Sequence, residues 1–224
     1  YNSLAKQSLN YVLITNNKKK IENEIGSLIK IKQISFKTIF KKKINFLSAH
    51  YKIEVYNFLS KQKNISCLLD LDILALNKLP TYLKYAAKKR INLVYNLNKK
   101  KINKSLNKKI IQSLRLCNNL KDNSSDWFGG EFVFGSSKFF HYLYKNIRTI
   151  LPNYKKHLSS MHHVGDETLL NAALQLIKKK KLISFNETNR KKIIGRFWSI
   201  NTVSRQKNIN YFLNNFLIHL PSDK

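Results

Sequence analysis

The chain has 224 residues, a length that suits one domain or at most two small ones. Hydrophobic residues make up 43% of it and aromatic residues 12%, which excludes an intrinsically disordered tail or linker. Its two cysteines, Cys67 and Cys117, are too few for a disulfide-rich scaffold and too far apart for a zinc site built on paired thiolates.

The formal net charge is +30, from 42 Lys and Arg against 12 Asp and Glu, and such a charge favours nucleic acid or an anionic membrane as a partner. Only six of the basic residues are arginine, however, the residue that makes bidentate contacts with guanine and phosphate. The lysines are spread along the chain and accompany many Asn and Ile, a composition typical of an AT-rich genome. We therefore interpret the charge mainly as a solvated surface, with attraction to anionic lipid head groups as a consequence.

Hydrophobic patterning predicts strands and helices that alternate along the chain. The expected elements are strand 11–15, helix 18–30, strand 34–40, helix 49–61, strand 65–69, helix 81–89, strands 91–95 and 132–134, helix 137–150 ending before Pro152, helix 166–179, strands 182–185 and 193–198, and helix 208–220. Residues 96–125 are rich in Lys and Asn, so we expect a surface excursion with one amphipathic patch at 110–116. This alternation favours the α/β class, with a mainly parallel central sheet flanked by helices.

No apolar run approaches the ~18–20 residues of a membrane-spanning helix. No secretion signal is recognisable after the first residue, Tyr1, and free thiols suit a reducing compartment. We therefore expect a cytoplasmic protein.

The twelve acidic residues are scarce enough for their positions to be informative. Six of them fall in three short segments, as the pairs Asp70 and Asp72, Asp126 and Glu131, and Asp166 and Glu167. Four of the six glycines, Gly129, Gly130, Gly135 and Gly165, lie in or beside the last two segments. In a chain so rich in Lys and Asn, this clustering indicates that these segments need acids and glycines.

The first segment, Asp70-Leu71-Asp72, follows the apolar residues 65–69, which we expect to be a strand buried on both faces. Ligands of open α/β sheets bind beyond the carboxyl ends of the strands. Two carboxylates two residues apart on such a loop suit Mg²⁺ or Mn²⁺ on a diphosphate. The alternative is a pair of solvated acids at a strand end, after which residues 73–76 return to the core.

In the second segment, Asp126 is followed by the aromatic and glycine-containing residues 127–132. Its adjacent glycines, Gly129 and Gly130, let the backbone approach a ligand closely, and Trp127 beside them offers a flat face to a sugar ring or a base. Glu131 is placed to accept hydrogen bonds from substrate hydroxyls. A tight turn that leads into a core strand explains the same residues equally well.

The third segment spans residues 162–167 and precedes an expected helix. Acids are favoured at a helix N-terminus, so Asp166 and Glu167 have either that structural role or a catalytic one. A neutral imidazole at His163 would suit a metal ligand or a proton carrier, although a single histidine in this setting is more often structural.

In this order and spacing, the three segments resemble the motifs of the GT-A glycosyltransferases, which use nucleotide-diphosphate sugars, particularly the bacterial enzymes of lipopolysaccharide and capsule assembly. Residues 166–171 also resemble the helix-opening acid pair of the blood-group-type galactosyl and N-acetylgalactosaminyl transferases. The resemblance implies one GT-A-like, Rossmann-type domain over residues 1–224. Its nucleotide-binding half would span about 9–96, and its acceptor and catalytic half about 126–220.

The resemblance also implies roles for individual residues. Asp70 and Asp72 would hold the divalent metal, Mn²⁺ or Mg²⁺, and His163 would complete its shell. The nucleotide-sugar would be bound by Thr15, Asn16, Asp70, Trp127, Gly129, Gly130 and Glu131. Asp166 and Glu167 would face the anomeric carbon as catalytic groups, and Arg196, Phe197 and Trp198 would close over the site.

The implied activity is transfer of a sugar from a nucleotide-diphosphate donor, with UDP-sugars among the candidates, to a glycan or lipid-linked acceptor at the inner face of the membrane. Two alternatives remain open. A metal-dependent nuclease or phosphotransferase would use Asp70, Asp72, Asp166 and Glu167 around two cations, whereas the transferase needs one metal at Asp70 and Asp72. A nucleic-acid-binding protein would need a one-sided basic face with interleaved aromatic residues.

Overall fold

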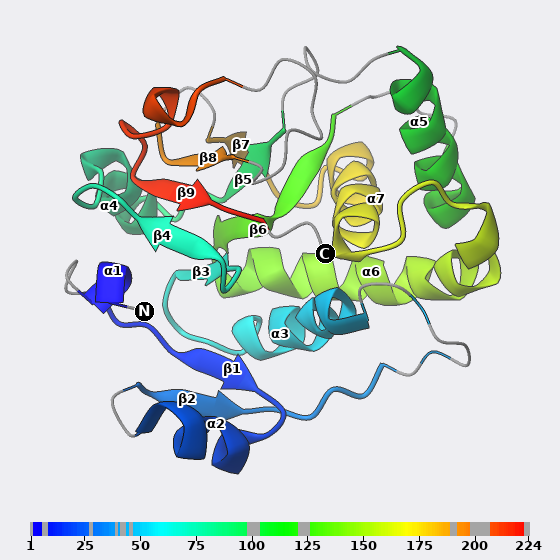
Figure 1. Ribbon diagram of the computed structural model, residues 1–224. Helices are drawn as coiled ribbons and strands as arrows, with labels where there is room; N and C mark the ends of the chain where they lie inside the picture. The colour runs from blue at the N-terminus through cyan, green and yellow to red at the C-terminus, as the bar shows by residue number, and fades with distance from the viewer. Residues whose placement is uncertain are drawn as a thin grey trace.

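The computed structural model describes residues 2–5, 9–26, 29–38, 40, 44, 47–97, 104–120, 126–188, 192–197 and 207–221 (Figure 1). The helices are α1 (Asn2–Ala5), α2 (Lys18–Ile25), α3 (Lys52–Leu59), α4 (Thr81–Lys88), α5 (Lys104–Asn118), α6 (Ser137–Lys156) and α7 (Asp166–Lys179), with 3-10 turns at Leu47–Tyr51, Leu158–Ser160 and Ile209–Tyr211. The strands are β1 (Leu13–Thr15), β2 (Ile31–Gln33), β3 (Ser66–Leu69), β4 (Ile73–Ala75), β5 (Leu93–Asn96), β6 (Phe128–Gly135), β7 (Asn186–Glu187), β8 (Ile194–Arg196) and β9 (Leu217–His219).

The described strands form three sheets, and their directions are mixed. The central sheet has the order β3-β6-β5-β7, in which β6 runs antiparallel to both of its neighbours and only β5 and β7 are parallel. A second sheet has the order β4-β9-β8, and β1 and β2 form a parallel pair. The α/β class is therefore confirmed, but the expected mainly parallel sheet is wrong, because an apolar run indicates a buried strand without indicating the direction of its partners.

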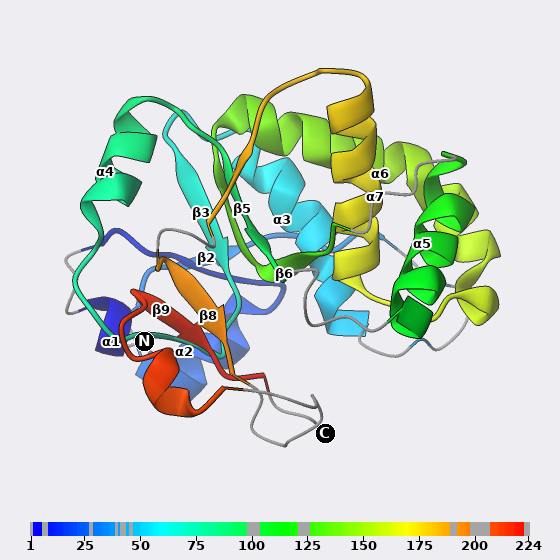
Figure 2. The same cartoon turned by 90° about the horizontal axis from the view of Figure 1, so that it is seen from above.

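The centre of the larger sheet is β6, in which all eight residues are buried. β3, expected to be buried on both faces, is instead an edge strand in which no residue is fully buried. Figure 2 shows α3, α6 and α7 on one side of β3, β5 and β6, and β8 and β9 on the other. Accordingly, Val133 packs in the cluster with the helices, whereas Phe132 and Phe134 pack with the second sheet. Because successive side chains of a strand point to opposite faces of the sheet, β6 contributes side chains to both hydrophobic cores.

Helix α6 carries most of the packing on the helical side, where it contacts α3, α5 and α7. Its apolar face repeats at helical spacing through Phe139, Leu143, Ile147, Ile150 and Tyr154, all buried. Burial of each large apolar side chain of this kind contributes roughly 1.5–3 kcal/mol relative to exposure. This packing fixes the start of α7, where two acids of the third segment lie.

Several element boundaries differ from the expectations. Residues 104–118 form a helix rather than a loop, because Ile110, Leu114 and Cys117 pack into the core. The exposed side of this helix carries Lys108, Lys109, Gln112 and Arg115. Helix α6 continues through Pro152, which is exposed on the same side as Arg148, the residue whose carbonyl loses its helical donor.

The expected helix at 208–220 is wrong, since only a 3-10 turn forms at Ile209–Tyr211 and residues 217–219 are strand β9. Apolar residues at 212 and 216–218 fit a helix face and a strand equally well, and pairing with β4 and β8 decides for the strand. β2 lies at 31–33 instead of 34–40, and β7 follows rather than fills 182–185. Within the described part of the chain, no helix combines the length and apolar character needed to cross a membrane.

Candidate active site

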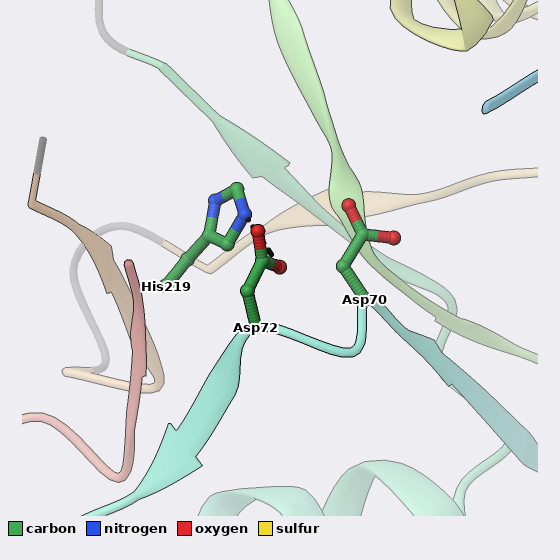
Figure 3. A group of neighbouring side chains, drawn as sticks. All are labelled: Asp70, Asp72 and His219. Atoms are coloured by element: carbon green, nitrogen blue, oxygen red, sulfur yellow. Dashed lines mark ion pairs between the residues drawn. The ribbon is translucent and has the colours of Figure 1, made fainter. Parts of the chain in front are cut away.

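Asp70 and Asp72 lie at the turn where the chain leaves the central sheet and enters the second one. Asp70 follows β3, Asp72 precedes β4, and Leu71 between them is exposed. β9 pairs with β4 so that its last residue, His219, stands opposite Ile73. The His219 Nε2 atom lies 3.0 Å from Asp72 Oδ1, and Figure 3 shows Asp70 beside this pair.

These three side chains form a candidate metal site. Asp70, Asp72 and His219 each offer one ligand atom, and these atoms all lie within 4.8 Å of one another. Two carboxylates and one imidazole suit a divalent cation, and the Asp72 side chain is 43% exposed, which leaves room for water or phosphate oxygens. The residues present therefore fit the divalent metal that the sequence motifs imply.

His163, the third metal ligand expected from the sequence, is not in this group. Its Nε2 atom lies 3.7 Å from Glu167 Oε2, and its ring contacts Trp127 edge to face. The structure brings His219 to the two aspartates instead, because β9 pairs directly with β4.

Lys52, the first residue of α3, joins the first and third acidic segments. Its Nζ atom lies 2.6 Å from Asp70 Oδ1 and 2.7 Å from Asp166 Oδ2, and it donates a hydrogen bond to Gly130 O at 3.1 Å. Burial alone would lower the pKa of Lys52, but attraction by Asp166 and Asp70 outweighs burial and raises this pKa well above its ordinary value. The ammonium group is therefore a permanent cation between the two carboxylates.

The same surroundings act on Asp70. Burial raises the pKa of its carboxyl to about 6, with Lys52 opposing the rise and Asp166 adding to it. Asp70 thus belongs both to the candidate metal group and to the ion pair with Lys52.

A second network surrounds Arg196, the last residue of β8. Its Nε and Nη2 atoms donate to Glu131 Oε1 and Oε2 at 2.8 and 2.6 Å, and Nη2 also bonds to Glu167 Oε1. The other Glu167 oxygen accepts a hydrogen bond from Trp127 Nε1 at 2.9 Å. Glu131 is fully buried; burial alone would raise its carboxyl pKa, but Arg196 and His219 outweigh burial and hold the pKa far below its usual range.

Both glycines of the second segment are needed because the chain's own carboxylates approach their backbone. A Cβ on Gly129 would lie 1.9 Å from Glu131 Oε2, and a Cβ on Gly130 would lie 2.0 Å from Asp166 Oδ2. The pairing of β6 with β5 is irregular at this point. Val94 pairs with Val133, but the next residue of β5, Tyr95, pairs with Gly129, so one step along β5 corresponds to four residues of β6. Gly130, Glu131 and Phe132 therefore have no partner on β5, an irregularity of the kind that changes the direction of side chains in a strand.

The remaining predicted residues lie in other surroundings. Thr15 ends β1 and accepts a hydrogen bond from Asn17 N at 3.1 Å, and Asn16 after it is exposed. Phe197 packs edge to face against Phe212. Trp198 lies outside the described residues.

The comparisons with known proteins give a distant similarity. No protein-family model and no curated protein matches the chain. Among solved structures, it is similar to the crystal structure of the galactosyltransferase LgtC in complex with donor and acceptor sugar analogues. That match has a TM-score of 0.48 and 13% identity, and it covers 92% of this chain and 69% of LgtC. The function must therefore be argued from the side chains of the site.

Two of the site residues, Lys52 and His219, are not singled out by the sequence. Lys52 is one lysine of 36 and carries no local signal. His219 follows the apolar residues 216–218 as Asp70 follows 65–69, and this shared pattern of a polar residue after an apolar run is a signal that could have located it.

Proposed function

We propose that this protein is a glycosyltransferase that moves a sugar from a nucleotide-diphosphate donor to a glycan or lipid-linked acceptor. The grouping of Asp70, Asp72 and His219 carries the proposal, because such a set holds a cation that in turn binds a diphosphate. When bound, the cation would neutralise the charge that develops on the departing diphosphate.

The contacts favour one metal over the two that a nuclease or phosphotransferase would need. A second cation shared by the first and third acidic segments would have to lie between Asp70 and Asp166, where the Lys52 ammonium already lies. Glu167 is likewise engaged, by Arg196 and Trp127. These contacts support transfer chemistry at a single-metal site.

Asp166 and Glu167 are the proposed catalytic carboxylates, with different tasks. Both Glu167 oxygens are held, by Arg196 and Trp127, which suits a fixed negative charge that stabilises an oxocarbenium-like transition state. One oxygen of Asp166 accepts a hydrogen bond from Lys52. We assign Asp166 the role of the general base, which takes the proton from the acceptor hydroxyl. The oxygen of the acceptor hydroxyl then bonds to the anomeric carbon. The bond between this carbon and the diphosphate oxygen breaks, and the diphosphate leaves with the electron pair of that bond.

The remaining assignments belong to the same proposal. Residues 9–96 would form the nucleotide-binding half, with Thr15 and Asn16 near the base, and residues 126–220 the acceptor half, with Trp127 and the glycines near the sugar. The net charge of +30 supports attraction to a lipid-linked acceptor at an anionic surface.

A thermal-shift screen with UDP, GDP and CMP, each with and without Mn²⁺, tests the proposal. A ligand at ten times its Kd stabilises a protein by about 1.4 kcal/mol, or roughly 3–5 °C for a chain of this size. We expect one nucleoside diphosphate to give such a shift only with Mn²⁺, and Asp72→Ala to lose it.

High salt separates specific binding from attraction by the surface charge. A coordinated metal and diphosphate at a partly buried site should keep most of the shift, whereas nonspecific attraction is screened. A shift that high salt abolishes and Asp72→Ala retains would refute the nucleotide-sugar site and leave a nonspecific basic surface.

A further inference from the structure

We propose that Glu131 is a positioning residue that orients His219 toward the metal. This inference rests on the proposed function, and it gives Glu131 a task other than the substrate contact expected from the sequence. His219 has a carboxylate at each ring nitrogen. Nε2 lies 3.0 Å from Asp72 Oδ1. Nδ1 is buried and makes no hydrogen bond as the side chains stand, and Glu131 Oε1 lies 3.4 Å from it.

The two carboxylates differ in a way that assigns them separate roles. The Asp72 side chain is 43% exposed, so Nε2 points to the side that water, metal and phosphate can reach. Glu131 is fully buried, so Nδ1 points into the protein. Histidine ligands of metals usually donate their second ring N–H to a carboxylate, which fixes the tautomer and the ring orientation.

The surroundings of Glu131 keep its carboxylate in place. Arg196 donates a hydrogen bond to each of the two Glu131 carboxylate oxygens. Arg196 also lies directly opposite His219 in the pairing of β8 with β9. Gly129 leaves the space that the carboxylate occupies, since a Cβ there would collide with Glu131 Oε2. The fold therefore holds Glu131 Oε1 in place as the nearby acceptor that the buried Nδ1 atom lacks.

These contacts form one continuous chain from the metal group to the start of α7. It runs from Asp72 through His219, Glu131 and Arg196 to Glu167. A plain counter-ion for Arg196 is the competing role for Glu131. Glu167 provides the matched control, because it pairs with the same guanidinium and has no contact of this kind with His219.

The test is the affinity for Mn²⁺ alone, measured by electron paramagnetic resonance on Glu131→Met, Glu167→Met and His219→Ala. Loss of an outer-shell partner typically weakens metal binding roughly 10–100-fold, and we expect that loss in Glu131→Met. Glu167→Met, which also leaves Arg196 short of one partner, should bind Mn²⁺ nearly as the wild type does.

The outcomes separate this inference from the proposed function. Wild-type affinity in Glu131→Met, with weak binding in His219→Ala, would overturn the positioning role and leave the metal site intact. An equal loss in Glu131→Met and Glu167→Met would overturn it as well, in favour of the counter-ion role. No binding by the wild type would refute the metal site itself. Unchanged binding in His219→Ala would exclude His219 as a ligand and overturn the positioning role with it.

A measurement on the unaltered network covers the case in which Glu131→Met does not fold. Proton NMR of the Co²⁺-loaded protein in water should show a hyperfine-shifted, slowly exchanging N–H proton from a coordinated, hydrogen-bonded imidazole. This signal should vanish in His219→Gln. Its absence from the Co²⁺-loaded wild type would overturn the inference, because a buried Nδ1–H that Glu131 accepts exchanges slowly.

Discussion

Replacing Arg196 by methionine should lower the free energy of unfolding by about 3–5 kcal/mol, because removal of one partner leaves buried charges uncompensated. Glu131 is fully buried and Glu167 nearly so, and Arg196 bonds to both. For a chain of this size, the melting temperature should fall by roughly 6–20 °C. Urea and thermal unfolding followed by circular dichroism measure the two quantities.

Arg148→Met is the matched control for this prediction. Arg148 is exposed on α6, so its loss should change the free energy of unfolding by no more than about 0.5 kcal/mol. Comparable stability of the two variants would show that the network around Arg196 does not hold Glu131 and Glu167 as described.

The second large effect is expected on catalysis. Asp166→Asn should lower the rate of sugar transfer by roughly 10²–10⁴-fold, the usual contribution of a general acid or base. Asparagine keeps the shape and can still accept a hydrogen bond from Lys52, so the fold and Mn²⁺-dependent nucleotide binding should persist. Release of nucleoside diphosphate from the donor, followed in a coupled assay, reports the rate.

Glu24→Gln serves as the control here, since Glu24 is exposed on α2 and its ion pair with Lys20 is solvent-exposed. Its activity should match that of the wild type. If Asp166→Asn kept most of the transfer rate while binding the donor normally, Asp166 would not be the base, and the assignment of the two acids at the start of α7 would have to change.

The sequence locates much of the site because acids are rare in it. Asp70, Asp72, Asp166 and Glu167 stand out against a lysine-rich background, and the structure brings Asp70 and Asp166 to the same ammonium group. The helix at 166–179 is predicted with the bounds that the structure shows, since its apolar spacing and its acidic start agree. The sequence alone is sufficient to predict a helix such as this one, because its apolar spacing and its acidic first turn both lie within the same few residues.

What the sequence does not reveal depends on contacts between distant segments. Lys52 meets Asp166 across 114 residues, and His219 reaches Asp72 only through the pairing of β9 with β4. The direction of β6 is likewise set by partners that come from other parts of the chain. Apolar residues at 216–218 fit a helix and a strand equally, so the metal group could not be completed from pattern alone.

The most direct test of the single-metal site is the anomalous scattering of Mn²⁺ in crystals grown with the nucleoside diphosphate that stabilises the protein. The account predicts one anomalous peak, bounded by Asp70, Asp72 and His219 and in contact with the diphosphate. A peak elsewhere, or two peaks that span Asp70 and Asp166 with Lys52 displaced, would contradict it.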